Sequence, residues 1–489
     1  MSISEEIKAN HLSLSQTNLT FLEYATQNLE FQRESNFRKM DLEGYFYKLH
    51  PWPTFVNRKS RLELETVSRK VFDLLRKIPG IFQNDPRQVA RFYGVPDQLA
   101  RYFIEGVGDF DRDILVGRGD FIIAEDDVKY LEYNVNTNIG GLEIPLWESK
   151  YFAVPQLTEY YESHNIQFRR KDVCAELLEH LARTQLERFP ERSQEVNIAI
   201  PISNFISQPE DNTKSAYFNS IYSDVRRKLD IPTGEIIFCS YNDLKQVGDY
   251  VFVNDKPVFT IMEWCQGFVP LHLWELFKEG KIILFNGPIS WMLSSKSNLA
   301  LLSEMEDSPL LTADEQDTVR RHIPWTRNVE PGTTTFERET IDMETLLIQR
   351  REKMVLKPAL GSGGRGIVVG KFTPPAQWNA IVQSAMKSTN WRHLDFEIPR
   401  KEEEWHRFST NAQNYVTWTV QEYVESKPLV YQSGYLGFST HRTVWGFILF
   451  GSRYAGGLVR ALPERVQEGV INCHQGAKLS VMFEVEEEQ

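Results

Sequence analysis

The sequence of 489 residues lacks any long hydrophobic run, since nowhere do about 18 apolar residues follow one another without a charged one. This absence argues against a membrane-spanning helix. Cysteine is scarce as well, and Cys174, Cys239, Cys265 and Cys473 show no Cys-x-x-Cys spacing. We therefore expect neither a zinc site nor a disulfide framework, but reduced and mostly buried thiols. The first residues lack the basic and apolar regions of a secretory signal, which predicts a cytoplasmic protein.

Basic charge is also in deficit, because 55 Lys and Arg stand against 67 Asp and Glu and give a net charge of −12. A chain with this balance is not expected to capture nucleic acid or an anionic membrane surface. Any anionic ligand must therefore meet a local basic site. The length corresponds to about three ordinary domains.

The pattern along the chain divides it into four parts and predicts an α+β fold. Residues 1–109 are expected to be helical, with apolar residues at helical spacing between 62 and 75 and a helix start at Asp85-Pro86. Residues 110–165 hold a small antiparallel β element with a hairpin turn at 125–127. Residues 166–290 alternate helices with short apolar runs, which is typical of an α/β domain, and residues 291–489 are rich in predicted strands.

A glycine-rich turn follows a predicted strand that carries Lys357. Its residues are Gly361, Ser362, Gly363, Gly364 and Gly366. The spacing matches the dinucleotide fingerprint, but that motif must open a helix, and the β-branched residues at 367–369 predict a strand instead. A strand, glycine turn and second strand can cover ATP phosphates with backbone N–H groups.

The charge around this turn also favours binding of phosphates. No Asp or Glu occurs from Lys353 to Arg392, although this window holds six Lys and Arg. The window predicts a positive site that could attract a polyphosphate. The alternative is a surface hairpin whose lysines are merely solvated.

Acidic and amide side chains are grouped upstream. Alternation along the predicted strand puts Glu132 and Asn134 on one face, and Asp120 on the adjoining strand could join them. Oxygen donors of this kind suit Mg²⁺, and Arg118, two residues before Asp120, could pair with a phosphoryl group. Taken alone, Glu-x-Asn at a strand end is more often a feature of a turn or of the surface than a metal site.

These residues together resemble the ATP-grasp superfamily in its circularly permuted branch, which includes the synthetase domain of glutathionylspermidine synthase and several natural-product peptide ligases. The resemblance extends from about residue 110 to 480. In the usual order the phosphate-binding lysines precede the Glu-x-Asn strand, whereas here Glu132 and Asn134 precede Lys296 and Lys357. The resemblance implies an ATP-grasp fold in residues 110–165 and 291–489, with residues 166–290 as the middle domain.

The resemblance also implies residue roles. Arg118 matches an arginine that stabilises an acyl phosphate; Asp120, Glu132 and Asn134 match magnesium ligands; and Lys296 and Lys357 match the two nucleotide lysines. The hinge that holds adenine resembles the segment Gln421, Glu422, Tyr423 and Val424. Arg460 matches, more loosely, an arginine near substrate and phosphate. Its alternative is a structural ion-pair partner, and Lys296 could be a solvated lysine.

The expected activity is that of an ATP- and Mg²⁺-dependent ligase, which joins a small carboxylate to an amine, such as an amino acid or peptide, through an acyl phosphate. Two alternatives stay open. One is an enzyme that transfers the acyl group to a carrier-protein thiol or phosphorylates a small molecule, and the other is a nucleotide-binding regulatory protein without catalysis. No cysteine precedes the metal strand, so the amidase domain of glutathionylspermidine synthase is not expected. The sequence leaves open whether copies of the chain assemble.

Overall fold

The computed structural model contains both helices and several separate sheets, in agreement with the α+β class. It describes residues 49–50, 53–105, 115–125, 127–135, 139–152, 158, 161–162, 165, 167–202, 212–264, 269–361, 363–388, 394, 396–397, 400–412, 417–432, 438–466 and 469–485. Predictions also fall on residues 1–48, Cys265 and Ser362, which lie outside these ranges. No described helix is long and apolar enough to cross a membrane.

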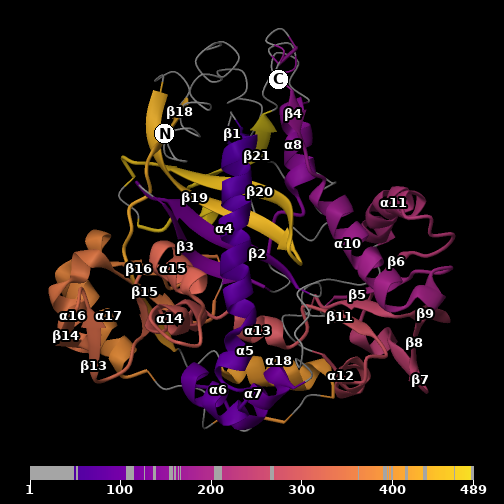
Figure 1. Ribbon diagram of the computed structural model, residues 1–489, viewed down its shortest axis with the longest axis horizontal. Coiled ribbons are helices and arrows are strands. Elements are labelled where there is room, and N and C mark those ends of the chain that lie inside the picture. The colour runs from indigo at the N-terminus through magenta and orange to yellow at the C-terminus, as the bar shows by residue number, and fades with distance from the viewer. Residues whose placement is uncertain are drawn as a thin grey trace.

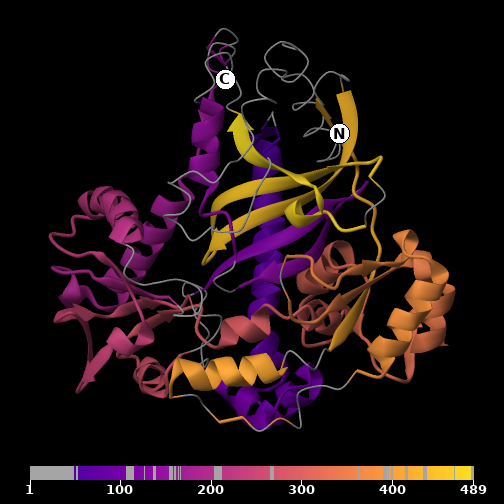
Figure 2. The same ribbon diagram turned by 180° about the vertical axis from the view of Figure 1, so that it is seen from behind.

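The centre of the molecule is an eight-stranded sheet, here called the large sheet (Figures 1 and 2). Its main path has the order β1-β21-β20-β19-β2-β3, while β18 and β4 pair with β19 and β21. The strands are β1 (Thr54–Asn57), β2 (Val116–Ile123), β3 (Val128–Asn134), β4 (Phe168–Arg169), β18 (Leu429–Gln432), β19 (Phe438–Phe450), β20 (Arg453–Pro463) and β21 (Lys478–Val485). Strands from both ends of the chain therefore form one sheet.

Helix α4 (Arg58–Arg76) crosses one face of the large sheet (Figure 1). The side chain of Asn57 caps it by accepting a hydrogen bond from the backbone N–H of Ser60. Its buried side includes Phe72, which stacks on Tyr133 with ring centroids 5.2 Å apart. Three short helices follow: α5 (Ile78–Ile81), α6 (Pro86–Tyr93) and α7 (Asp97–Ile104). Asp85 caps α6, as its sequence predicts.

A parallel sheet lies beside the large sheet, on the right in Figure 1. It has the order β11-β10-β5-β6 and is packed by α10 and α11. The elements of this region are α8 (Ile144–Phe152), α10 (Val173–Arg188), β5 (Ile198–Pro201), α11 (Asn212–Lys228), β6 (Ile236–Cys239), β7 (Lys245–Val247), β8 (Tyr250–Val253), β9 (Lys256–Val258), β10 (Thr260–Met262), α12 (Leu271–Lys278) and β11 (Ile283–Phe285). The side chain of Asn286 joins this sheet to β2 by bonding both the N–H and the C=O of Val116.

A third sheet, β12-β17-β15-β16, forms what we call the small lobe, together with α16 and α17. The helices and strands of residues 289–422, which include the small lobe, are α13 (Ile289–Leu293), α14 (Ser297–Glu304), α15 (Ala313–His322), β12 (Thr326–Asn328), β13 (Thr333–Phe336), β14 (Glu339–Asp342), α16 (Met343–Gln349), β15 (Met354–Pro358), β16 (Val368–Val369), α17 (Pro375–Met386), α18 (Glu402–Ala412) and β17 (Trp418–Glu422). Leu356 and Val420 pack toward Trp378 of α17. The alternate residues of β15 and β17 therefore face away from these helices.

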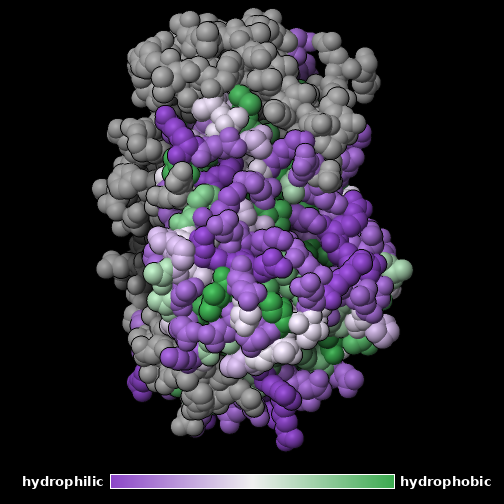
Figure 3. Space-filling view, turned by 90° about the vertical axis from the view of Figure 1, so that its left-hand side faces the viewer, coloured by the Kyte–Doolittle hydropathy of each residue, from purple (hydrophilic) through white to green (hydrophobic). Residues whose placement is uncertain are grey.

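On the side that bears the small lobe, the surface is mostly hydrophilic and its hydrophobic side chains are scattered (Figure 3). Cys174 and Cys239 are buried and Cys473 is half-buried, and all three are free thiols. The predicted domain boundaries stay predictions. The large sheet takes strands from all four predicted parts of the chain, with β1 from the first, β2 and β3 from the second, β4 from the third and β18 to β21 from the last.

Candidate functional site

The acidic residues meet on β2 and β3, which are antiparallel neighbours. Asp120 is opposite Glu132 in the register, and Arg118 is opposite Asn134. All four share the face of the large sheet that points away from α4, on whose side Tyr130 and Tyr133 pack. The sheet thus gathers the four polar side chains that the sequence predicts to lie together.

Glycine on β2 is required by this packing. A Cβ atom at position 119 would lie 2.6 Å from the Tyr130 ring and 3.0 Å from the Tyr133 ring. On the neighbouring strand, a Cβ at Gly446 would lie 2.9 Å from the side chain of Arg118. The first contact explains the glycine between Arg118 and Asp120, and the second identifies a site glycine that the sequence analysis missed.

Asp120 is held by two arginines. Arg118 donates from Nε to Oδ1 at 2.7 Å and from Nη2 to Oδ2 at 3.0 Å, and Nη2 of Arg460 lies 2.8 Å from Oδ2. Burial alone raises the pKa of Asp120, but the two guanidinium groups outweigh it and hold this pKa well below its usual range. Asp120 is therefore an anion throughout the physiological range, and Arg460 is an ion-pair partner in the site itself.

Two buried lysines lie near Glu132, whereas the two arginines contact Asp120. Lys357 donates to the backbone oxygen of Leu131 at 3.1 Å and to Oε1 of Gln421 at 2.6 Å. Lys296 contacts the carboxylate of Glu132 at 3.1 Å and donates to the backbone oxygen of Gly361 at 3.0 Å. Each lysine is only 5% exposed. Both phosphate-binding candidates are thus close to Glu132, from segments more than 150 residues away in the sequence.

The surroundings of Lys357 change its pKa strongly. Burial lowers the pKa of Lys357 to about 8, the nearby charge of Lys296 adds to this effect, and Glu132 opposes it. Lys357 therefore stays mostly protonated at neutral pH and loses its charge as the pH rises through about 8, and an approaching anion favours its charged form.

A cavity of about 820 Å³, counting the space open to solvent at its mouth, lies between the large sheet and the small lobe. Its polar lining includes Asp120, Glu132 and Arg460 from the large sheet and Lys357 and Gln421 from the small lobe. The remaining wall is mainly aliphatic, with Ile122, Leu131, Val355, Ile367, Val369, Val444, Val470 and Ile471. An apolar pocket with charged groups at one end suits a ligand with a flat ring and an anionic part.

The glycine turn connects β15 and β16, which pair antiparallel as the sequence predicts. Gly361, Gly363, Gly364 and Gly366 all have positive φ angles between 67° and 145°. Of the described turn residues, Gly364 lines the cavity, whereas Gly363 and Gly366 do not, and Ser362 lies outside the described residues. The turn therefore borders the cavity without covering it.

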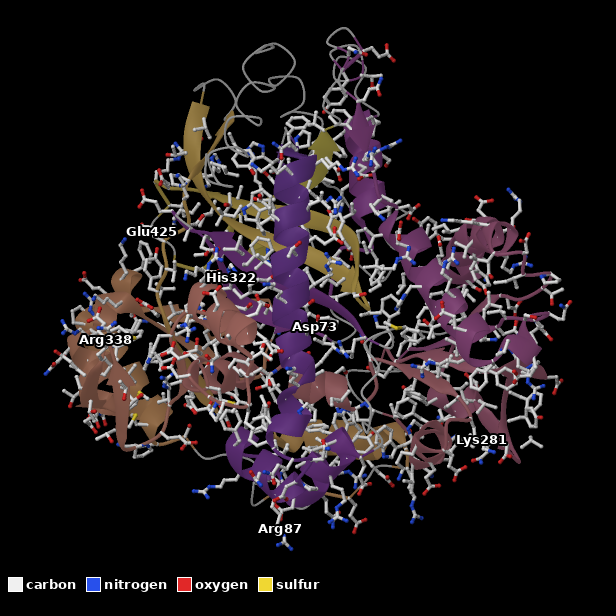
Figure 4. All side chains as sticks on the ribbon, viewed as in Figure 1. Asp73, Arg87, Lys281, His322, Arg338 and Glu425 are labelled. Atoms are coloured by element: carbon white, nitrogen blue, oxygen red, sulfur yellow. The ribbon has the colours of Figure 1, made fainter. Side chains whose placement is uncertain are left out.

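The basic window is less positive than its sequence predicts, which is a correction. Lys353 pairs with Glu337 and Lys371 pairs with Glu425 at 3.1 Å, and both acids come from outside the window. Glu425 lies at the edge where the small lobe meets the large sheet (Figure 4). Only Lys357 among the described lysines of the window lines the cavity. The sequence alone does not reveal these acidic partners, because only the fold brings Glu337 and Glu425 close to the lysines.

The predicted hinge follows β17 and lines the cavity with Gln421, Glu422, Tyr423 and Val424. Gln421 bonds Lys357, so its side chain takes part in the polar end of the cavity. Burial raises the pKa of Glu422, and the neighbouring Glu337 adds to this.

Several lining residues were not predicted. Ser426, Arg442 and the segment 469–472 close the cavity from the side of β19 and β20. Arg442 donates to the backbone oxygen of Val466 and lies over the Phe372 ring at 5.1 Å. An arginine in a long β-strand could have drawn attention, but the segment 469–472 carries no pattern that distinguishes it from an ordinary loop.

The two carboxylates and the amide also suit a cation. Asp120 and Glu132 stand opposite each other, and a like-charge pair at such a position is destabilising unless cations compensate it. Asn134 points to the same place, with Nδ2 3.3 Å from Asp120 Oδ2. Among the described residues, no group of three or more His, Cys, Asp or Glu side chains is arranged to hold a metal. Asp120, Glu132 and Asn134 therefore stay candidate ligands, and their oxygen atoms are of the kind that Mg²⁺ shares with water and phosphate.

Comparison with known proteins adds little to this geometry. No protein-family model matches the chain, and no curated protein is similar to it in sequence. Among solved structures, a glutathione synthetase-like effector from Globodera pallida in its apo form aligns with 98% of this chain and 97% of its own, at 10% identity and a TM-score of 0.49. Two chains at this level need share neither fold nor activity.

Proposed function

We propose that the protein is an ATP-dependent ligase that joins a small carboxylate to an amine through an acyl phosphate, releasing ADP and phosphate. One observation carries the proposal: a single cavity between two antiparallel sheets holds Asp120 and Glu132 on one wall and Lys357 on the other. Enclosure of a nucleotide between two such sheets is the arrangement of an ATP-grasp fold. The proposed fold is circularly permuted, because Glu132 and Asn134 precede both lysines.

The aliphatic walls of the cavity would take the adenine ring, with the backbone at 422–424 along its edge. The triphosphate would extend toward Lys357 and Lys296, where the two lysines exchange their present carbonyl and carboxylate partners for phosphate oxygens. This exchange is favourable because a phosphate bears more charge than a carbonyl and forms stronger hydrogen bonds.

Asp120, Glu132 and Asn134 would hold Mg²⁺ in this proposal. When bound, the ion would neutralise part of the negative charge on the phosphate oxygens. Arg118 and Arg460 hold Asp120 ionised and in one orientation through their charge-assisted bonds. Four cationic side chains, Arg118, Arg460, Lys296 and Lys357, surround two carboxylates, so the cavity favours an anion over a bare metal ion.

In the reaction, an oxygen of the substrate carboxylate attacks the γ-phosphorus and the bond to ADP breaks, giving an acyl phosphate. The amine nitrogen then attacks the carbonyl carbon, the C–O bond to phosphate breaks, and the amine proton leaves to phosphate or solvent. Arg118 and Arg460 lie where they can stabilise the negative oxygen of the tetrahedral state. No enzyme nucleophile is needed, in keeping with the raised pKa of the Cys473 thiol, about 11, which burial causes.

The test is release of ADP in the presence of pools of amino acids, peptides and small carboxylates, followed by mass spectrometry of the products. An amide would support the proposal, whereas a thioester or phosphate ester would assign another acceptor. Lys357→Ala and Glu132→Ala are expected to lower turnover at least 100-fold. Lys353→Ala is the matched control, because Lys353 pairs with Glu337 outside the cavity.

Two results contradict the proposal. One is full turnover in Lys357→Ala or Glu132→Ala. The other is nucleotide binding without ADP release across a broad panel, which identifies a nucleotide-binding protein without ligase activity.

A further inference from the structure

A second large cavity lies beside the N-terminal part of α4, where Arg61, Leu62, Glu65 and Arg69 line it. It has a volume of about 1360 Å³, including space open to solvent, and lies between α4, α8 and the strands β20 and β21. In Figures 1 and 2, α4 and α8 stand on either side of β21. It shares no lining residue with the cavity between the two sheets. We call it the α4–α8 cleft.

Cationic side chains dominate the lining of the cleft. They are Arg61 and Arg69 from α4, Arg169, Arg170 and Lys171 from the segment after β4, and Arg453 from β20. This density is unusual in a protein whose net charge is −12. The backbone of Gly456 and Gly457 forms another part of the wall and leaves the space in front of β20 open.

Carboxylates in and beside the cleft form ion pairs with some of these cationic side chains. Arg61 bonds both Glu65 and Glu484, and Glu176 contacts Lys171 at 2.9 Å and Arg453 at 3.2 Å. Arg69 has no ion-pair partner among the residues that the structure describes, and Arg170 lies over the Phe152 ring at 4.5 Å. Cationic charge therefore exceeds what the lining carboxylates Glu65, Glu148 and Glu484 can neutralise.

The remaining lining carboxylate, Glu148, does not offset this excess strongly. It is buried, and its burial raises its pKa to about 7, while Arg170 lowers the pKa and Asp172 raises it. Close to neutral pH about half of the Glu148 side chains are uncharged. The surplus of positive charge in the cleft is thus retained at this pH.

The cleft and the first cavity lie at different parts of β20. Arg460, toward the end of the strand, lines the first cavity, whereas Arg453 and Tyr454, at its start, line the cleft, where Arg61 lies 5.4 Å from the centroid of the Tyr454 ring. An anion in the cleft therefore cannot be the nucleotide whose phosphates contact Lys357. A separate ligand is required.

We infer that the α4–α8 cleft binds a small polyanion with at least two phosphate or carboxylate groups. Guanidinium groups from two elements converge on it, and their planar forks match both kinds of oxygen pair. The spread of cations over α4, the 169–171 segment and β20 favours a ligand with separated charges over a single ion. Binding joins α4 to the large sheet, so the ligand also stabilises this end of the molecule.

Isothermal titration calorimetry of the full chain tests the inference with tripolyphosphate and, separately, with propane-1,2,3-tricarboxylate. The double variant Arg69→Ala/Arg170→Ala is expected to weaken binding of the preferred probe at least tenfold, since both side chains are exposed and their loss need not disturb the fold. Arg87→Ala is the matched control, because Arg87 lies on α6 at the other end of the molecule (Figure 4).

The Lys357→Ala variant separates the two cavities. Binding that survives Lys357→Ala but falls in Arg69→Ala/Arg170→Ala supports the cleft, and preference for one probe tells phosphate from carboxylate chemistry. Binding that is lost in Lys357→Ala and kept in the double variant assigns the anion to the first cavity and overturns the inference. It is overturned equally if neither probe binds wild-type protein at millimolar concentration, whatever the outcome for ATP.

Discussion

At the scale of single residues, the charge of the site depends on burial as much as on residue type. Lys357 has the most informative environment, because it is enclosed and yet would have to be cationic to hold the phosphate of the proposed nucleotide. Asp120 shows the opposite case, since Arg118 and Arg460 keep it ionised despite its burial.

The pKa of Lys357, about 8, predicts a pH limit for nucleotide binding. The protonated form binds phosphate, so the Kd for ATP is expected to be constant below pH 7 and to rise about tenfold per pH unit above 8. Lys357→Arg keeps the charge at all these pH values and is expected to remove the dependence. Fluorescent-nucleotide titrations from pH 6.5 to 9.5 measure it, with Lys353→Arg as control. An unchanged slope in Lys357→Arg would assign the titration to another group.

Gly119 gives a prediction about stability. In Gly119→Ala the new Cβ would lie 2.6 Å from the Tyr130 ring, so the strand must shift or the ring must move. We expect the free energy of unfolding to fall by about 1–3 kcal/mol in urea denaturation. Gly80→Ala in α5 is the comparison, because its Cβ would have nothing within 4 Å, and it should leave stability unchanged or raise it by up to about 1 kcal/mol. Equal effects would mean that the close contact is not the cause.

At the scale of elements, alternation along β3 predicts that Glu132 and Asn134 share a face. It does not predict that Asp120 faces Glu132, because the register of β2 and β3 shifts at a bulge after Asp120. The sequence likewise predicts the strand–turn–strand at 354–369. It could not predict that Glu337 and Glu425 neutralise Lys353 and Lys371, since these pairs depend on how loops fold back.

Asn286 links two elements and can be tested. Its side chain completes hydrogen bonds with the N–H and C=O of Val116, and removing it leaves two buried backbone groups unsatisfied. We expect Asn286→Ala to lower the free energy of unfolding by about 2–4 kcal/mol and to increase hydrogen exchange at the start of β2. Asn242→Ala, at an exposed position, is the control. Unchanged exchange at Val116 would show that the strand is held by its neighbours alone.

At the scale of the whole molecule, the site exists only where two sheets approach each other. Residues such as Arg442 and the segment 469–472 could not be recognised in the sequence, because they become lining residues only through the path of β19 and β20. The positive surplus around Asp120 and Glu132 is also a property of the assembled cavity, and from it we expect the nucleotide to bind before or together with the metal.

Mg²⁺ alone is therefore expected to bind weakly, because Lys296 already occupies Glu132 and two arginines hold Asp120. ATP with Mg²⁺ at 100 times its Kd should stabilise the fold by about 2.7 kcal/mol. Thermal unfolding with Mg²⁺, with ATP plus EDTA and with both separates these cases, and Lys357→Ala should abolish the combined shift. A large shift with Mg²⁺ alone would contradict the charge balance described for the cavity.

The strand order of the large sheet has a consequence for how the chain is made. The carboxylate strands β2 and β3 leave the ribosome roughly 300 residues before β19, the strand against which β2 pairs. At ~5–20 residues per second, their free edge waits roughly 15–60 s for its partner. During synthesis an exposed strand edge is a target for wrong pairing or for a chaperone. The acidic half of the site thus keeps an open edge during most of the synthesis of the chain, until β19 pairs with β2.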